Sequence, residues 1–170
     1  MLELGTPAPT FALPDVVTGE TVRLEDFAPS PALLVVFLCA HCPYVHHVQA
    51  GLARLGRDYA GQGVALVGIT SNDLKQYPQD SPAETARFVK EAGFEFPVLY
   101  DETQAVAKAY SAACTPDFFA FGPDRTLLYR GQLDDSRPNR GSSTGNRAPL
   151  DGRDVRAAID AILALSLIHI

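Results

Sequence analysis

The longest uninterrupted apolar stretch in the first part of the chain is Ala32–Leu38, which contains no polar residue. A run of this length, partly β-branched, predicts a strand that is buried on both faces, as in a parallel sheet. The segment after it is apolar at intervals of three and four residues, at Val45, Val48, Leu52 and Leu55. This period predicts an amphipathic helix that ends near Gly61 or Gly63. Val64–Ile69 then predicts a second buried strand, which completes a right-handed strand–helix–strand unit.

The other apolar segments are shorter and are separated by turn-forming residues. They predict strands at 10–13, 21–24, 96–100, 118–121 and 126–129, and helices at 81–92, 102–109 and 154–165. Ser81 and Pro82 suit the start of a helix, and Gly93 suits its end. Residues 132–152 are polar and rich in Gly, Pro, Ser and Asn, which predicts a long loop.

These elements predict an α/β fold with a central mixed β-sheet flanked by helices and an N-terminal β-hairpin. A chain of 170 residues is long enough to bury one sizeable core and too short for two full domains. We expect residues 1–165 to form a single domain. We expect residues 166–170 to be a vector-derived tail.

Composition and charge exclude several classes of partner. The chain has 14 Lys and Arg against 20 Asp and Glu, a net charge of -6, and its basic residues are scattered. It lacks the basic surface that would bind nucleic acid or anionic headgroups. No apolar stretch approaches the roughly 20 residues of a membrane span, and the N-terminus lacks the pattern of a secretory signal. We expect a cytoplasmic protein with no nucleic-acid or membrane partner.

The main candidate for chemistry is the pair Cys39 and Cys42, which are separated by Ala40 and His41 and follow the first buried strand. If these four residues form one helical turn, the two Cα atoms lie roughly 5 Å apart, within disulfide range. In a reducing compartment, a close cysteine pair in a chain with three cysteines points to redox chemistry or metal binding.

The position of the pair at a helix N-terminus predicts a role for each residue. Unpaired N–H groups and the helix dipole stabilise a thiolate there, so we expect Cys39 to be the nucleophile. Cys42, deeper in the helix, is expected to be more buried and to act as the resolving thiol. His41 is expected to lower the pKa of Cys39. Pro43 disfavours helical geometry at Cys42 and could itself be the first helical residue.

A second candidate segment is Cys114-Thr115-Pro116, before the strand at 118–121. A cis bond before Pro116 would present open backbone groups to an extended peptide, which would make Thr115, Pro116 and Cys114 a substrate-binding surface. A trans proline in an ordinary loop, with Cys114 as a small buried residue, fits the spacing equally well.

Metal binding is the alternative interpretation of the cysteines. A structural zinc site usually has four ligands, and Cys114 is the only cysteine besides Cys39 and Cys42. A thiophilic ion held by these three cysteines therefore remains an alternative to redox chemistry. We expect no bound cofactor. Arg130 is interpreted as half of a salt bridge, and His47 as a surface or capping residue.

Four segments along nearly the whole chain resemble the redoxin (AhpC/TSA-like) branch of the thioredoxin superfamily. They are Gly5-Thr6-Pro7-Ala8-Pro9 with Phe11, Phe37-Leu38-Cys39-Ala40-His41-Cys42-Pro43-Tyr44, Cys114-Thr115-Pro116-Asp117-Phe118-Phe119, and Asp134-Asp135-Ser136-Arg137-Pro138. The resemblance implies a thioredoxin fold, a redox pair at Cys39 and Cys42, and a cis bond at Pro116 facing that pair.

The chain departs from the family pattern in two places. Counting back from either cysteine of the pair, the Thr and Pro of the peroxiredoxin signature are absent. Thioredoxin itself has a buried acid on the strand before its cysteines, whereas Ala32–Leu38 has none. Proton handling therefore requires His41, water or a group from elsewhere in the chain.

These observations predict an enzyme, a thiol–disulfide oxidoreductase that uses Cys39 and Cys42 in antioxidant chemistry or protein-disulfide reduction. Its expected partners are protein or small-molecule disulfides and an external thiol reductant. The alternatives are an atypical, peroxiredoxin-like thiol peroxidase and a thiophilic metal-binding redox protein.

Overall fold

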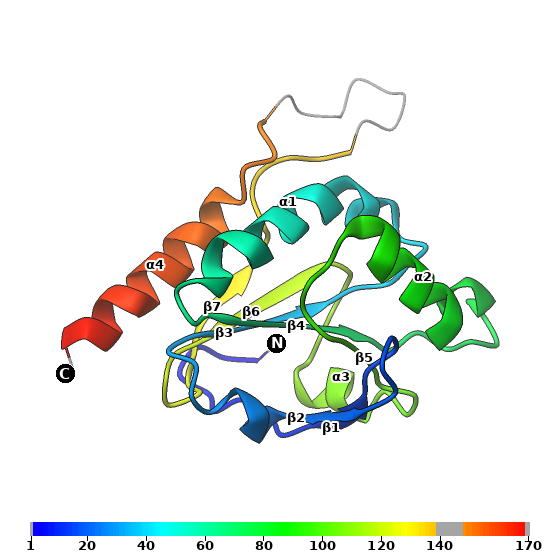
Figure 1. Cartoon of the computed structure of the whole chain (residues 1–170), viewed down its shortest axis with the longest axis horizontal. Coiled ribbons are helices and arrows are strands. Elements are labelled where there is room, and N and C mark those ends of the chain that lie inside the picture. The colour runs from blue at the N-terminus through cyan, green and yellow to red at the C-terminus, as the bar shows by residue number, and fades with distance from the viewer. Residues whose placement is uncertain (1, 139–147, 169–170) are drawn as a thin grey trace.

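A central five-stranded sheet organises the molecule in a computed structural model of the chain, which describes residues 2–138 and 148–168 (Figure 1). In spatial order the strands are β5 (Val98–Tyr100), β4 (Ala65–Thr70), β3 (Leu33–Phe37), β6 (Asp117–Phe121) and β7 (Leu127–Gly131). The pairs β3–β4 and β4–β5 are parallel, and the pairs β3–β6 and β6–β7 are antiparallel. The sheet is therefore mixed, as the sequence predicts.

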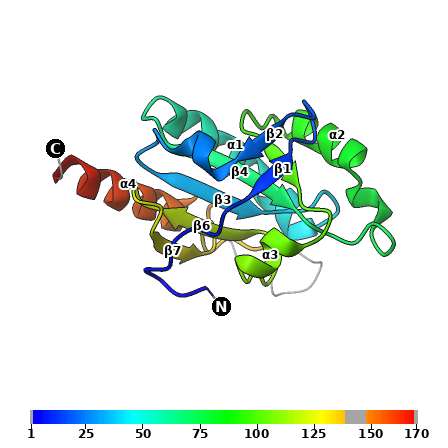
Figure 2. The ribbon, with the colours of Figure 1, turned by 90° about the horizontal axis from the view of Figure 1, so that it is seen from below.

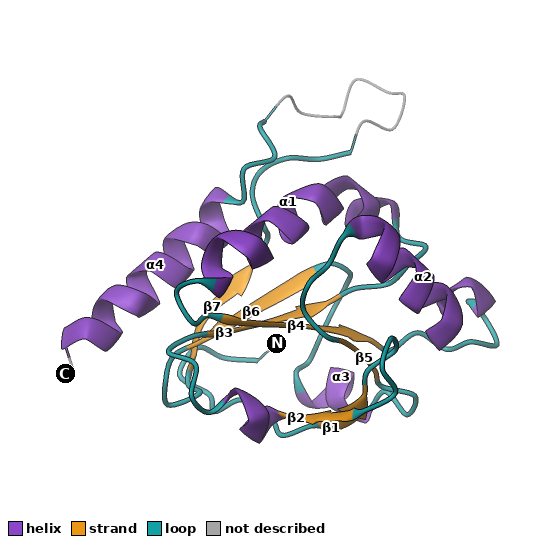
Figure 3. Ribbon diagram, viewed as in Figure 1, coloured by secondary structure: helices purple, strands orange, loops and turns teal. Residues whose placement is uncertain are grey.

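Helices and a hairpin cover the two faces of this sheet (Figures 2 and 3). One face carries α1 (Pro43–Ala60), α2 (Pro82–Ala92) and α4 (Arg153–Ile168). The other carries α3 (Ala105–Ala109) and the antiparallel hairpin of β1 (Ala12–Pro14) and β2 (Thr21–Arg23). Two short 3-10 helices are η1 (Leu24–Phe27) and η2 (Pro78–Asp80). This is the predicted thioredoxin fold with an N-terminal hairpin.

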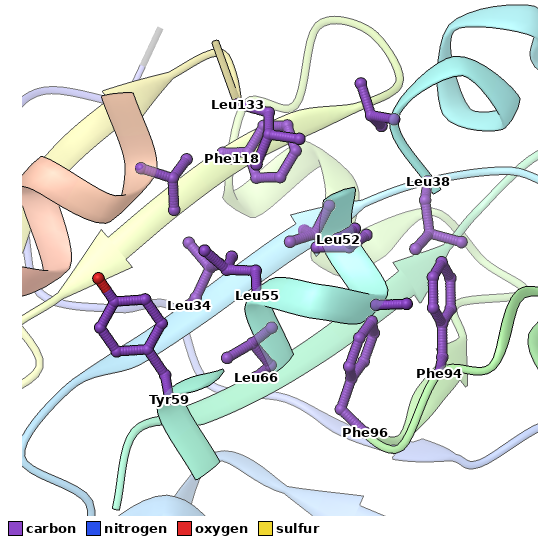
Figure 4. Packing of buried hydrophobic residues seen from close by; sticks show 14 of the residues in the cluster. Leu34, Leu38, Leu52, Leu55, Tyr59, Leu66, Phe94, Phe96, Phe118 and Leu133 are labelled. Atoms are coloured by element: carbon purple, nitrogen blue, oxygen red, sulfur yellow. The ribbon is translucent and has the colours of Figure 1, made fainter. Parts of the chain in front are cut away.

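Strand β3 is buried on both faces, which explains its continuous apolar sequence. Leu34 and Val36 point into the core beneath the α1, α2 and α4 helices, and Leu33, Val35 and Phe37 point into the core on the hairpin side. Figure 4 shows the first of these cores. Alternate side chains of a strand face opposite sides, so burying both sides requires apolar residues at every position.

Helix α2 begins and ends at the residues that the sequence indicates. The Ser81 side chain accepts a hydrogen bond from the backbone N–H of Glu84 at 3.3 Å, and Pro82 occupies the first helical position. Gly93 adopts a left-handed conformation with φ of 69° at the C-terminal end. Ser81 is also the C-terminal cap of η2, so η2 leads directly into α2.

The predicted loop at 132–152 has no helix or strand at 132–138 or 148–152, and its residues 139–147 lie outside the described residues. Helix α4 continues beyond the predicted end at Leu165 to Ile168, so the backbone of 166–168 continues the helix, while residues 169–170 lie outside the described part of the chain. Within the described residues, no helix combines the length and the apolar character that crossing a membrane requires.

Candidate active site

The two cysteines of the pair lie in a turn between β3 and α1. The backbone N–H of Cys42 points to the carbonyl of Cys39 at 3.5 Å, and Cys42 caps α1 in an extended conformation. Pro43 is the first helical residue, because a residue before proline is disfavoured in helical geometry. The CxxC segment is therefore a turn in front of the helix, and not its first helical turn.

The expected order of burial is wrong. Cys39 is 2% exposed, whereas Cys42 is only half-buried. Cys39 stays at the end of the buried strand, and the turn brings Cys42 out to the mouth of α1. Both cysteines, like Cys114, are free thiols.

The expectation that the Cys39 pKa is lowered is also wrong. Burial raises the pKa of Cys39 to about 11, although a hydrogen bond from Thr115 acts in the opposite direction. The negative charge of Asp80 raises this pKa further. Cys39 therefore needs a nearby base before it can act as a thiolate.

Thr115 contacts the sulfur atoms of both cysteines. The Sγ of Cys39 lies 3.2 Å from Oγ1 of Thr115, and the Sγ of Cys42 donates to the Thr115 carbonyl oxygen at 3.3 Å. The Thr115–Pro116 bond is cis, which confirms the expectation. Thr115 thus forms one site with the two cysteines, although it follows Cys39 by 76 residues and Cys42 by 73 residues in the sequence.

A buried ion pair supports the loop that carries Thr115. Nη2 of Arg130 lies 2.7 Å from Oδ2 of Asp117, and both side chains are less than 10% exposed. The same carboxylate oxygen accepts the N–H of Ala113 at 3.1 Å. Arg130 also donates to the carbonyl of Ser111. The interpretation of Arg130 as a salt-bridge residue is confirmed, and the pair holds the segment containing Cys114.

His41 contacts a buried acid that the sequence analysis did not identify. Its Nδ1 lies 2.5 Å from Oδ2 of Asp80, and its backbone N–H donates to Oδ1 of the same residue at 3.0 Å. Asn72 donates a further hydrogen bond to Oδ2 at 2.7 Å. The ring of Tyr77 stacks on the His41 ring with centroids 4.9 Å apart. Asp80 lies 39 residues from His41, at the end of the short 3-10 helix η2, so no spacing in the sequence indicates this contact.

A pocket of about 280 Å³ opens beside the cis bond. The predicted residues Cys114, Thr115 and Pro116 form part of its wall, together with Tyr44, His47 and Ser136. Nε2 of His47 lies 3.0 Å from Oγ of Ser136, which ties α1 to the segment after β7. From the sequence His47 was expected to be a surface or capping residue, whereas the segment containing Ser136 carries part of the family resemblance.

The cysteines do not gather around a common metal position in the described part of the chain. The candidate cluster there is formed by Cys39, His41 and Asp80, whose ligand atoms lie within 4.8 Å of one another. Both carboxylate oxygens of Asp80 already accept hydrogen bonds. Oδ1 accepts one from the backbone N–H of His41, and Oδ2 accepts one from Nδ1 of His41 and one from the Asn72 side chain. The geometry is that of a hydrogen-bonded imidazole–acid pair with the Cys39 thiol close by.

Solved structures share this fold. An uncharacterized conserved protein from Geobacillus kaustophilus is 53% identical, with a TM-score of 0.90 over 96% of this chain and 84% of that chain. A thiol:disulfide interchange protein of the thioredoxin family from Chlorobium tepidum is 18% identical, with a TM-score of 0.70 over 96% and 99% of the two chains. Peroxidoxin BcpB from Mycobacterium tuberculosis is 20% identical, with a TM-score of 0.68 over 95% and 99%.

A search of curated proteins gave no match. The model of the AhpC/TSA family matches residues 4–130, which is most of the chain and includes both cysteines of the pair, Thr115 and Pro116. On this match, the chain belongs to the AhpC/TSA family.

Proposed function

We propose that the protein is a thiol–disulfide oxidoreductase that cycles Cys39 and Cys42 between a dithiol and a disulfide. The observation that carries this proposal is that both sulfur atoms contact Thr115. A turn of four residues keeps its end Cα atoms within about 7 Å, close to the upper reach of a disulfide. The fold shared with a thiol:disulfide interchange protein supports the same activity.

In this proposal Cys42 attacks first and Cys39 resolves, the reverse of the sequence-based expectation. A disulfide substrate has to reach the attacking sulfur, and Cys42 is half-buried while Cys39 is 2% exposed. Cys42 also caps the N-terminus of the 18-residue helix α1, a position that favours an attacking thiolate. Cys39 then needs only to reach the sulfur of Cys42 at the other end of the same turn.

The reaction balances as a two-electron exchange. Cys42 thiolate attacks one sulfur of a substrate disulfide, forms a mixed disulfide and releases the first substrate thiol. Cys39 attacks Cys42, closes the intramolecular disulfide and releases the second thiol. An external thiol reductant restores the dithiol, and we assign this cycle to the cytoplasm. Protein or small-molecule disulfides are the proposed substrates.

We assign substrate binding to Thr115, Pro116 and Cys114 at the wall of the 280 Å³ pocket. The exposed ring of Tyr44, which follows the pair directly, borders the same pocket. An apolar pocket wall beside the cis proline suits an extended peptide or a small organic disulfide.

The test uses an aromatic disulfide that releases a coloured thiol, in a Cys114→Ser background so that the exposed third thiol does not react. The reduced protein is expected to release two thiols and to form the intramolecular disulfide. With Cys39→Ser added, it is expected to release one thiol and retain one substrate moiety on Cys42, seen as a mass increase. With Cys42→Ser added, little adduct is expected, because Cys39 is buried.

Adduct accumulation only with Cys42→Ser would restore the roles expected from sequence. Release of a single thiol by the reduced Cys114→Ser protein, with no disulfide between Cys39 and Cys42, would contradict the proposed function itself.

A peroxidase function is the second candidate, favoured by the match to the AhpC/TSA family and the fold shared with a peroxidoxin. Cys42 would then be oxidised by a peroxide to a sulfenic acid, and Cys39 would condense with it and release water. Consumption of hydrogen peroxide, with a sulfenic acid trapped on Cys42 in the Cys39→Ser variant, would support this antioxidant role. Absence of turnover with hydrogen peroxide and an alkyl hydroperoxide would remove it.

A further inference from the structure

The buried position of Cys39 creates a need for a base. As the resolving thiol, Cys39 has to lose its proton in a site where burial raises its pKa to about 11. The strand before it, Leu33–Phe37, contains no acid. The titratable groups that face Cys39 are Cys42 in the same turn, His41 between them and Asp80 from η2.

Asp80 is a fully buried acid, with 0% of its surface exposed. Among the described residues its ionic partner is His41, and neither Lys nor Arg contacts its carboxylate. The two hydrogen bonds from His41 and the one from Asn72 hold the carboxylate in a fixed position. The carboxylate therefore lies in a fixed position beside an imidazole, where it can interact with a neighbouring proton donor.

His41 connects this acid to solvent. Its ring is held on one side by Asp80 and on one face by Tyr77, while 30% of its side chain remains exposed. A sulfur atom of Cys39, a ring nitrogen of His41 and an oxygen of Asp80 lie within 4.8 Å of one another. Catalytic hydrogen bonds are often long before the reacting complex forms, so a small movement would bring the thiol within reach of the imidazole–acid pair.

We propose that Asp80, together with His41, accepts the proton of the Cys39 thiol during resolution of the mixed disulfide. This inference rests on the proposed function. As the proton moves to the Asp80–His41 pair, the Cys39 sulfur attacks Cys42, the bond between Cys42 and the substrate sulfur breaks, and the substrate leaves as a thiolate. His41 then passes the proton to solvent or to that thiolate.

The test separates the two thiol releases in time, by stopped-flow absorbance with the aromatic disulfide and the reduced Cys114→Ser protein. Addition of Asp80→Asn is expected to leave the first release within about twofold and to slow the second by about 100-fold or more at neutral pH, the range of a general base. As the pH approaches the Cys39 pKa of about 11, the difference is expected to close, because the thiol then ionises without a base.

A matched control is Asp101→Asn, which changes another acid that is 1% exposed and whose carboxylate accepts the N–H of Ala107 instead. It is expected to leave both releases unchanged. If Asp80→Asn does not fold, His41→Gln at the partly exposed position is expected to slow the second release selectively, with the same recovery at high pH.

Equal slowing of both releases, or a slowing of the second release that is the same at every pH, would overturn the role of Asp80 and His41. So would zinc that co-purifies in equal amount with the protein and is lost with Asp80→Asn, because the cluster would then be a metal site. Failure of the unsubstituted protein to release a second thiol would instead contradict the proposed function.

Discussion

The Oγ1 atom of Thr115 lies 3.2 Å from the Sγ atom of Cys39, and this contact lowers the pKa of the Cys39 thiol, whereas burial raises it. We expect Thr115→Val to raise the Cys39 pKa further, because the hydroxyl that favours the thiolate is lost. The measurement is a titration of thiolate ultraviolet absorbance in a background with Cys42→Ser and Cys114→Ser. Thr126→Val, in the hairpin turn where the hydroxyl contacts Asp124, is the control. An unchanged midpoint for Thr115→Val would contradict the prediction.

The ion pair of Asp117 and Arg130 is predicted to stabilise the fold only as a complete pair. Arg130→Met leaves a buried carboxylate without its cation, and we expect a loss of about 3–5 kcal/mol in the free energy of unfolding. Adding Asp117→Leu to Arg130→Met is expected to recover part of that loss. Urea unfolding of the single and double variants checks both statements.

Arg130→Met is also expected to speed alkylation of Cys114, because Asp117 accepts the backbone N–H of Ala113 next to it. An exposed ion pair contributes at most about 1 kcal/mol to the free energy of unfolding. A loss below that value for Arg130→Met would contradict the prediction and show that the Arg130 guanidinium is solvated.

Gly68 in β4 has no space for a side chain, and we predict that any substitution there destabilises the protein. A Cβ atom there would lie 3.0 Å from Cγ2 of Val98 and 3.1 Å from Cδ2 of Leu38, inside normal contact distance. We expect Gly68→Ala to destabilise the protein by about 1–3 kcal/mol through overpacking. Gly61→Ala is the control, because its Cβ meets nothing within 4 Å and its φ of -67° suits alanine. Equal thermal stability of the two variants would contradict the prediction.

The stability of the segment after β7 is predicted to depend on pH through Asp134. Burial opposes ionisation of this acid, but hydrogen bonds from Ser136, Gly152 and Asp151 outweigh it and lower the pKa of Asp134. A lowered pKa in the folded state contributes stability above the unfolded value of about 3.9, and this is lost as the pH falls through the folded value.

We therefore expect Asp134→Asn to lower the urea midpoint at neutral pH, with a smaller difference from the unsubstituted protein in acid. Glu102→Gln, at an exposed position, is expected to leave the midpoint nearly unchanged at both pH values. A difference for Asp134→Asn that grows in acid would have the wrong sign.

The fold was largely predictable from the sequence, because its strongest signals are local. The apolar run at Leu33–Phe37 and the caps of α2 at Ser81 and Gly93 are set by short-range patterns, and the structure has each of them. The cis bond at Pro116 is also present, and it was expected from the family resemblance.

The arrangement inside the site was less predictable. Helix α1 begins at Pro43, one turn later than a helix that includes both cysteines, and Cys39 is then more buried than Cys42. Hydrophobic periodicity does not resolve a shift of a single turn at a helix start. Asp80 meets His41 only through the tertiary fold, from a segment without regular periodicity.

Strand β3 ends two residues before Cys39, and this connection makes the two cysteines of the pair differ in how readily they are oxidised. The N–H of Leu38 still donates to Ile69 in β4, so the ladder reaches the residue before the cysteine. Uncovering Cys39 then requires separation of the most deeply packed part of the molecule, and slow hydrogen exchange at Leu38 is the expected signature. Irreversible overoxidation should accordingly accumulate on the more exposed Cys42 and Cys114, while the buried Cys39 stays reduced for longer.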